Sequence, residues 1–231
     1  MKKFLLLFVL SGSFLFSSCS NTENNPSGPV VTDPRLSVIN ASNVANENTR
    51  LSINADTVNT NFTYGSVFPY RTLSIGPHRV NIKYSSNQRS GTVTLGLDYD
   101  GDQRYTMFVY DVNQPFIGTS VNLMRVNDNR ANPGSGNCKV RIAYFSTDAG
   151  TVRAELQGSS GNFTGLTNGT VSEYREFTGS SNSINIIQSN TGESLGTTSL
   201  NLQPGGFYTI MISGKLRAAM PRLDIKLISQ N

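Results

Sequence analysis

The sequence contains no tryptophan, one histidine and two cysteines among its 231 residues. A hydrolytic triad needs a base, usually histidine, and a structural zinc site needs several Cys or His ligands. These shortages argue against nucleophilic catalysis and against a zinc site, and no cofactor is indicated. Charged residues form 15% of the chain, and no basic run is longer than a pair, so a nucleic-acid partner is not expected.

No segment shows a convincing helical period, and the most informative stretch is the N-terminus. Lys2 and Lys3 precede an apolar run over residues 4–16, two serines follow, and Cys19 comes next. This order is typical of a secretory signal, which is too short to be a stable membrane span. The position of Cys19 resembles a bacterial lipobox, in which the thiol is diacylated. A plain signal peptide with an incidental cysteine is the alternative.

Residues 1–18 are therefore a predicted lipoprotein signal peptide, and their removal from the 231-residue chain leaves 213 residues. Loss of two lysines lowers the basic count from 19 to 17 against 15 acids, so the mature net charge is +2. Residues 19–34 are a predicted lipidated tether, because Asn21–Pro29 contains no apolar residue that could be buried in a core. We expect an exported lipoprotein, attached by acyl chains such as palmitate to the outer membrane, on its periplasmic or cell-surface face.

Short runs of alternating apolar and polar residues begin at Leu36, each bounded by Gly, Pro, Asn or Asp. They recur about every 10–15 residues, which is typical of an all-β sandwich or barrel. Once Cys19 is lipidated, Cys138 is the only thiol left, so no intramolecular disulfide can form. We expect Cys138 to be a small apolar residue at the start of a strand.

The chain repeats itself at an offset of 103–104 residues. Residues 65–71 match 169–175, residues 80–82 match 184–186, and residues 97–107 match 200–210. We therefore predict two tandem immunoglobulin-like β-sandwich domains, each with about seven strands. The predicted bounds are 35–126 and 138–231, joined by a turn-rich linker at 127–137.

Three phrases of the sequence carry a family resemblance: the strand opening Lys139–Ala149, the pattern Gly-x-Val-x-x-Tyr at residues 65–70 and 169–174, and a glycine turn before Tyr-Thr at 101–106 and 205–209. The folded part resembles the bacterial family known as domain of unknown function 4397. The resemblance implies two copies behind a signal peptide, and it implies no activity. The composition is similar to that of lipoproteins of the Bacteroidetes.

The local cluster best suited to a cation is the segment 98–102, in which Asp98, Asp100 and Asp102 alternate with other residues. Carboxylates at such a turn could converge on Ca²⁺, although no downstream glutamate closes an EF-hand loop. The second copy has Asn201–Gly205 there, without a carboxylate. A hairpin turn is therefore the main alternative to a weak cation site.

The pairs Tyr70–Arg71 and Tyr174–Arg175 recur at the same position of both copies. They could bind an anionic ligand or a glycan; the alternative places the arginines outward on a strand and the tyrosines in the core. We expect His78 to be an exposed turn residue rather than a catalytic one. Thr57 lies in Asp56-Thr57-Val58, which resembles an O-glycosylation acceptor of the Bacteroidetes.

We expect a non-enzymatic, lipid-anchored protein of the cell envelope that binds or scaffolds a glycan or an envelope protein. An envelope enzyme acting on polysaccharide is one alternative, and it would need two carboxylates that face each other across a groove. A purely structural surface subunit is another alternative, and it would show extensive exposed edge strands.

Overall fold

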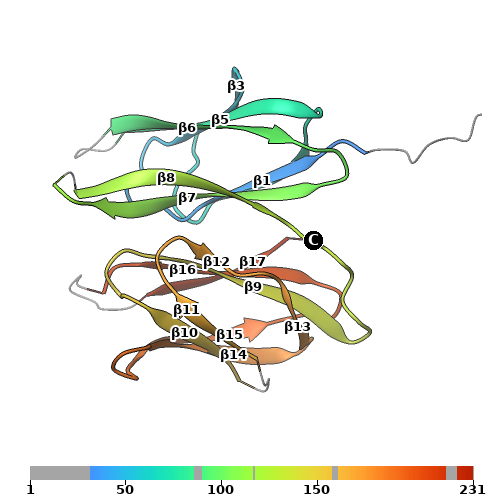
Figure 1. Ribbon diagram of the computed structural model, residues 1–231, viewed down its shortest axis with the longest axis vertical. Helices are drawn as coiled ribbons and strands as arrows, with labels where there is room; N and C mark the ends of the chain where they lie inside the picture. The colour runs from blue at the N-terminus through green and yellow to red at the C-terminus, as the bar shows by residue number, and fades with distance from the viewer. Residues whose placement is uncertain (1–31, 86–89, 117, 158–160, 217–222, 231) are drawn as a thin grey trace, which may run out of the picture. The chain divides into compact units, whose positions relative to one another are not determined.

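A computed structural model describes residues 32–85, 90–116, 118–157, 161–216 and 223–230 (Figure 1). These residues form β-strands joined by turns and loops, and none of them is helical. The prediction of an all-β sandwich fold is thereby confirmed. Within these ranges no helix exists that could cross a membrane.

The first eight strands are β1 (Arg35–Asn40), β2 (Arg50–Ile53), β3 (Asp56–Asn59), β4 (Val67–Thr72), β5 (Gly76–Ser85), β6 (Ser90–Tyr99), β7 (Arg104–Gln114) and β8 (Gly118–Asn127). They form two sheets with the orders β4-β1-β7-β8 and β3-β2-β5-β6, which lie face to face (Figure 1). Neighbouring strands are antiparallel except β1 and β7, which are parallel. This arrangement is called the first sandwich.

The remaining strands are β9 (Asn137–Ser146), β10 (Val152–Leu156), β11 (Asn162–Leu166), β12 (Thr170–Val171), β13 (Arg175–Thr178), β14 (Ser181–Gln188), β15 (Ser194–Asn201), β16 (Phe207–Gly214) and β17 (Asp224–Ser229). One sheet has the order β12-β9-β16-β17, with β13 also paired to β9, and the other has the order β11-β10-β14-β15. Strands β9 and β16 are parallel. This second sandwich repeats the pairing of the first, with β12 and β13 together in place of β4.

The topology refines the expected seven-stranded sandwich. In the described part of the chain each sandwich has eight strand positions, and its first strand lies parallel to its seventh in the middle of one sheet. Constant immunoglobulin domains instead divide seven strands into ABED and CFG sheets. The chain shares the sandwich architecture and orders its strands differently. The bounds 35–126 and 138–231 stay predictions, since all described residues belong to one compact unit, Val31–Asn231.

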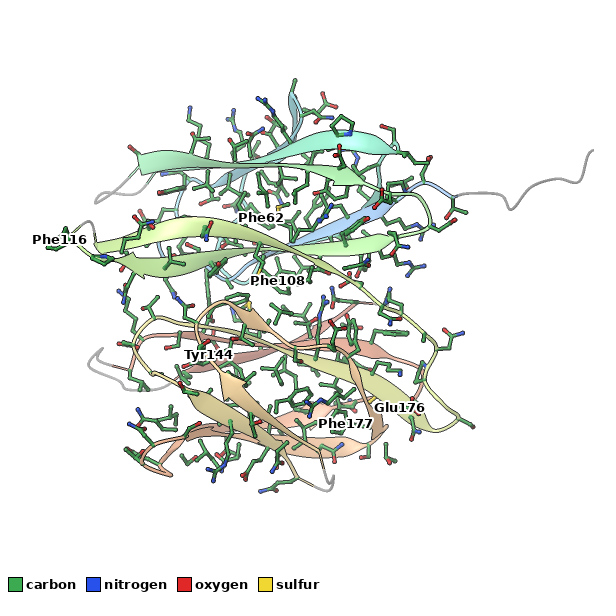
Figure 2. The ribbon with its side chains drawn as sticks, viewed as in Figure 1. Phe62, Phe108, Phe116, Tyr144, Glu176 and Phe177 are labelled. Atoms are coloured by element: carbon green, nitrogen blue, oxygen red, sulfur yellow. The ribbon has the colours of Figure 1, made fainter. Side chains whose placement is uncertain are left out.

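Alternating side chains of the strands fill the core of each sandwich. In β5, buried residues such as Val80 and Ile82 alternate with more exposed ones, as a strand with one solvated face requires. Phe62 lies fully buried between the sheets of the first sandwich, whereas Phe116 projects into solvent after β7 (Figure 2). Cys138, the second residue of β9, is fully buried, which confirms its predicted role.

The segment Asp98–Asp102 is a turn between sheets and not the expected hairpin. Strand β6 ends at Tyr99 in one sheet, and β7 begins at Arg104 in the other. Residues 202–206 make the same crossing between β15 and β16. Asp and Gly suit both kinds of turn, so the sequence alone could not separate them.

Gly179, which follows β13, has no room for a side chain. An added Cβ would lie 2.6 Å from the backbone nitrogen of Pro204 and 2.7 Å from its Cδ. We expect Gly179→Ala to lower the free energy of unfolding in urea by about 1–3 kcal/mol, as overpacking does. The control is Gly96→Ala in β6, where the added Cβ would lie 3.6 Å from Arg79 Cγ. Its effect should stay within about 0.5 kcal/mol, and equal losses in both variants would contradict this account.

Candidate functional site

The two tyrosines of the repeated motif lie where the two sandwiches meet, and not in either core as expected. Tyr70 on β4 donates its hydroxyl proton to Asp128 Oδ2, just after β8. Tyr174, just before β13, donates to Gln230 Oε1 at 2.8 Å, just after β17. The two acceptors thus occupy matching places at the ends of the last strands.

Four positions recur on the two facing sheets. The strand register pairs Ser37 with Thr106 in the first sandwich and Arg141 with Thr209 in the second. The tyrosine and the threonine are the same in both sandwiches, whereas the other two positions differ. The sets are Ser37, Tyr70, Thr106 and Asp128 in the first sandwich, and Arg141, Tyr174, Thr209 and Gln230 in the second. An acid on one side therefore meets an arginine from the other.

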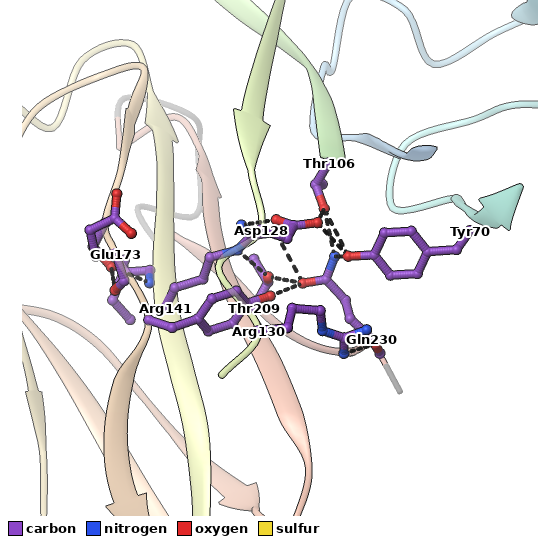
Figure 3. A network of polar contacts seen from close by, with 11 residues as sticks. Tyr70, Thr106, Asp128, Arg130, Arg141, Glu173, Thr209 and Gln230 are labelled. Carbon is purple, nitrogen blue, oxygen red and sulfur yellow. Dashed lines mark hydrogen bonds and ion pairs between the residues drawn. The ribbon is translucent and has the colours of Figure 1, made fainter. Parts of the chain in front are cut away.

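Arg141 is the centre of a closed polar network (Figure 3). Its Nη1 donates to Asp128 Oδ1, its Nε donates to Thr209 Oγ1 at 2.8 Å, and its Nη2 donates to Gln230 Oε1 at 3.1 Å. The side chains of Arg141 and Asp128 are 2% and 0% exposed. A charge buried this deeply requires a partner, because leaving it alone costs several kcal/mol.

Gln230 joins the two halves of this network. Its Nε2 donates to Thr106 Oγ1 at 2.9 Å, and Thr106 Oγ1 in turn donates to Asp128 Oδ2 at 2.7 Å. Burial and the Asp128 charge hold the pKa of Tyr70 above its usual value, and burial also raises the pKa of Tyr174. Both tyrosines therefore stay protonated and remain donors.

Apolar side chains continue the contact beyond the polar network. The register makes Ile39 equivalent to Ala143, and Ala41, two residues later, equivalent to Phe145. A large residue on one side thus corresponds to a small one on the other, as close packing of two unlike surfaces requires. The buried members of this cluster are Ile39, Ala41, Phe108, Tyr110, Ala143, Phe145, Met211 and Ile228.

The glycine of the repeated motif also lies at this contact. Gly65 has a φ of 78°, and an added Cβ would overlap Lys226 Nζ of the second sandwich. Its neighbour Tyr64 donates to Asp224 Oδ2 at 2.6 Å, and Lys226 Nζ lies 4.2 Å from the Tyr64 ring centroid. The pattern Gly-x-Val-x-x-Tyr therefore marks the surface by which the two repeats join.

A polar groove of about 860 Å³ opens beside the network. Both sandwiches and the segment between them line it: Asp102, Gln103, Arg104, Asn127, Asp128, Asn129, Arg130, Asn132, Glu173, Gly205 and Phe207. The Arg130 guanidinium lies 4.2 Å from the Phe207 ring centroid, and its Nη2 donates to the Gln230 carbonyl. Burial lowers the pKa of Arg130, and its buried Nε has no hydrogen-bond partner among the described residues.

A family model described as "Domain of unknown function (DUF4397)" matches residues 34–155, which is more than half of the chain. The chain belongs to the DUF4397 family. The DUF4397 match covers the first sandwich, the segment that follows it, β9 and most of β10. It includes Tyr70, Asp128 and Arg141 but not Gln230. No curated protein matches the chain.

The predicted cation site of this DUF4397 chain is not assembled. Among the described residues, no three His, Cys, Asp or Glu side chains are grouped so as to hold a metal ion. Asp102 instead accepts hydrogen bonds from the N and Oγ1 of Thr32, at 2.7 and 2.8 Å, and these bonds lower its pKa. The Asp98 carbonyl accepts a bond from Arg125. The structure therefore supports a turn and does not gather Asp98, Asp100 and Asp102 into a site.

The two arginines of the proposed ligand site lie apart from the groove. Arg71 is exposed on β4, and Arg175 Nη1 donates to the Asn162 carbonyl at 2.8 Å. Neither arginine lines the groove or joins the network described above. Ligand binding at Tyr70, Arg71, Tyr174 and Arg175 stays a prediction, but both tyrosine hydroxyls are occupied by protein acceptors.

His78 is a buried residue of β5, which corrects the expectation of an exposed turn. It is 8% exposed, and its Nε2 lies 2.8 Å from the Ser74 carbonyl. A carbonyl can only accept, so Nε2 carries the proton and Nδ1 accepts from Asn54 Nδ2 at 3.0 Å. Thr57 is exposed on β3, and its glycosylation stays a prediction. Cys19 lies outside the described residues.

The sequence contains a signal for the importance of Asp128 and Arg141, which local patterns do not reveal. The predicted bounds put Asp128 in the linker, and Arg141 belongs to the strand-opening phrase that carries the family resemblance. Aligning the repeats residue by residue sets Ser37 against Arg141 and Asp128 against Gln230. An acid in one copy and an arginine in the other, at otherwise matching polar positions, would have pointed to a contact between the copies.

Removal of the buried acid should test the importance of this network. We expect Asp128→Ala to lower the free energy of unfolding in urea by about 3–5 kcal/mol, because Arg141 would keep a buried charge without its counter-ion. The control is Glu155→Gln, which breaks the 2.8 Å pair with Arg153, whose side chain is 37% exposed. That change should cost about 1 kcal/mol or less. A loss for Asp128→Ala no larger than the control would contradict the central role of the pair.

Proposed function

We propose that this chain is a non-enzymatic, lipid-anchored protein of the bacterial cell envelope that binds a glycan in the groove between its two sandwiches. The observation that carries the proposal is the groove of about 860 Å³ beside the buried Arg141–Asp128 network. Both sandwiches contribute to its lining, and the network fixes them to each other there. A wall that is already ordered lowers the entropy cost of binding.

The lining of the groove suits a ligand rich in hydroxyl groups. Four amide side chains, Gln103, Asn127, Asn129 and Asn132, each offer both donors and acceptors, as sugar hydroxyls require. Arginines and carboxylates line the groove together, which favours a neutral polymer over a strongly charged one.

Two of the three carboxylates that line the groove, those of Asp102 and Asp128, are held by bonds within the protein, which supports binding over hydrolysis. A glycosidase needs a general acid whose pKa is raised, facing a second carboxylate. The pKa of Asp102 is instead lowered by its bonds from Thr32. Asp128 is bonded through Oδ1 to Arg141 and through Oδ2 to Tyr70 and Thr106.

Attachment through Cys19, an outer-membrane location and a tandem arrangement of Bacteroidetes type are part of this proposal. The predicted tether reaches the folded part beside the groove, since Thr32 bonds to the groove residue Asp102. Two acyl chains on Cys19 would give stable attachment, which a single chain would not.

Lipidation can be tested in cells that produce the full chain. We expect an alkyne analogue of palmitate to label the protein, and Cys19→Ser to abolish the label and move the protein to the soluble fraction. Cys138→Ala should keep the label, because Cys138 is fully buried. Undiminished labelling of Cys19→Ser would contradict the anchor. Protease shaving of intact cells then shows whether the sandwiches face the medium or the periplasm.

Glycan binding can be tested with the chain from Ser20 onward on an array of envelope polysaccharides, followed by calorimetry. We expect Asn129→Ala with Asn132→Ala to weaken the binding about tenfold or more, because hydrogen bonds from the groove are lost. The control is Asn190→Ala, an exposed asparagine between β14 and β15. Equal affinity in the double variant would remove the groove from the proposal, and no binding to any polysaccharide would remove the ligand class.

A further inference from the structure

Among the residues that the structure describes, strand β6 has a neighbouring strand on one side only. It ends the sheet β3-β2-β5-β6 and pairs with β5 over the whole of Ser90–Tyr99 without a register shift. The free side of an edge strand presents a row of backbone N–H and C=O groups to which another strand can pair. With ten residues, β6 is longer than a typical strand, so it offers a long edge for pairing with another strand.

Pro77 and Arg125 fix which backbone groups of β6 face the open side. Pro77 lies opposite Asp98 and has no N–H, and Arg125 donates to the Asp98 carbonyl, which therefore points away from β5. Backbone direction alternates along a strand, so every second residue shares this orientation. These residues are Thr92, Thr94 and Gly96. Within the described ranges, their backbone groups have no other strand to pair with.

The strand lacks most of the features that protect other edges, and among the described residues a side chain blocks it only at the Asp98 carbonyl, which accepts from Arg125. Residues 90–99 contain no Pro, Lys or Arg, and the pairing with β5 has no bulge. By contrast, β4 contains Pro69 and a register shift, and β17 contains Lys226. In β8 the backbone N–H of Leu123 is bonded to the Asn122 side chain at 2.9 Å. Natural proteins use such devices to block unwanted pairing.

The inner face of β6 is incompletely covered. Val93, Leu95 and Leu97 point toward the core but are only partly buried, whereas Val80 and Ile82 on the neighbouring β5 are fully buried. The difference arises because the sheet stops at β6. One more strand beside it would remove this apolar surface from water.

We propose that a second copy of this chain supplies that strand, with β6 antiparallel to β6 across a two-fold axis at Thr94. Thr94 then faces Thr94 of the second copy and Thr92 faces its Gly96, and each such pair exchanges two backbone hydrogen bonds. The charges are compatible, because Asp98, the one charged residue of β6, faces Ser90 rather than another acid. On the inner face, Val93 of each copy meets Leu95 of the other. The contact is isologous and closes at a dimer.

The predicted tether is another segment that could be considered as a partner of β6. Thr32, the first described residue, bonds to Asp102 in the turn that follows β6. However, residues 21–29 include Pro26, Gly28 and Pro29 and no large apolar side chain. Proline cannot donate to a ladder, and glycine weakens a strand. A second copy of β6 is therefore the better partner.

Introducing a charge at Thr94, the residue on the two-fold axis, tests the proposal. We expect the chain from Ser20 onward to be a dimer by size exclusion with light scattering at about 0.1 mM, a concentration suited to a small interface. Thr94→Lys alone and Thr94→Glu alone should each be monomeric, because like charges face each other. An equimolar mixture of the two variants should restore the dimer, because Lys then faces Glu.

The second sandwich provides a matched control. Thr94 donates to Asn81 at 2.7 Å, and Thr197 on β15 donates to Asn185 at 3.1 Å in the same arrangement. Thr197→Lys should leave the dimer intact. If circular dichroism shows that the charged variants are unfolded, Thr94→Cys tests the same contact. Its thiol should form an intermolecular disulfide on oxidation, because residues facing each other in such a pair lie about 5.5 Å apart.

Several outcomes would overturn the proposal. A monomeric wild-type chain, or a dimer that survives both Thr94→Lys and Thr94→Glu, would exclude the β6 contact. Loss of the dimer in Thr197→Lys alone would assign the contact to β15. Open-ended oligomers would indicate a head-to-tail contact, and loss of the dimer on deletion of residues 20–31 would assign it to the tether. Glycan binding should be the same in the Thr94 variants and the wild type, so the two proposals can fail separately.

Discussion

A guanidinium buried between two β-sheets must have a carboxylate beside it, and the pair formed by Arg141 and Asp128 meets this need. The two partners come from different repeats of the sequence, so neither sandwich can satisfy its own buried groups at this place. Thr106, Thr209, both tyrosines and Gln230 saturate the remaining hydrogen bonds. The pair therefore makes the two sandwiches dependent on each other, and it holds the wall of the groove in one position.

Tandem repeats allow a contact that is not symmetric. Two identical chains related by a two-fold axis would make every pair twice, so one aspartate and one arginine in each chain would give two ion pairs. Here the two repeats share the tyrosine and the threonine. They differ at the other two positions, where Ser37 corresponds to Arg141 and Asp128 corresponds to Gln230. Equivalent positions also differ in the apolar part of the contact, where the large Ile39 corresponds to the small Ala143.

Much of the fold could be predicted from local pattern, because period-two alternation reports which residues face inward. The same pattern does not report what lies on the other side of a face. The pattern marks Tyr70 and Tyr174 as equivalent and allows either a ligand site or a place in a core, but it does not distinguish a core from an interface between repeats, since both exclude water. The expectation for His78 is wrong because Gly76 and Pro77 suggest a turn, whereas Pro77 occupies a place in β5 where no N–H is needed. The partnership of Asp128 and Arg141 depends on distant strands, and no local rule reveals it.

The position of Gln230, directly after β17, affects the order in which the polar network can be completed. A polypeptide is made from its N-terminus, and domains generally fold in that order. The first sandwich can form early, but Thr106 gains its bond from Gln230 only after β17 has been made. Arg141 lies in the first strand of the second sandwich and donates to the same Gln230 side chain. Closure of the contact between the sandwiches therefore coincides with completion of the second one.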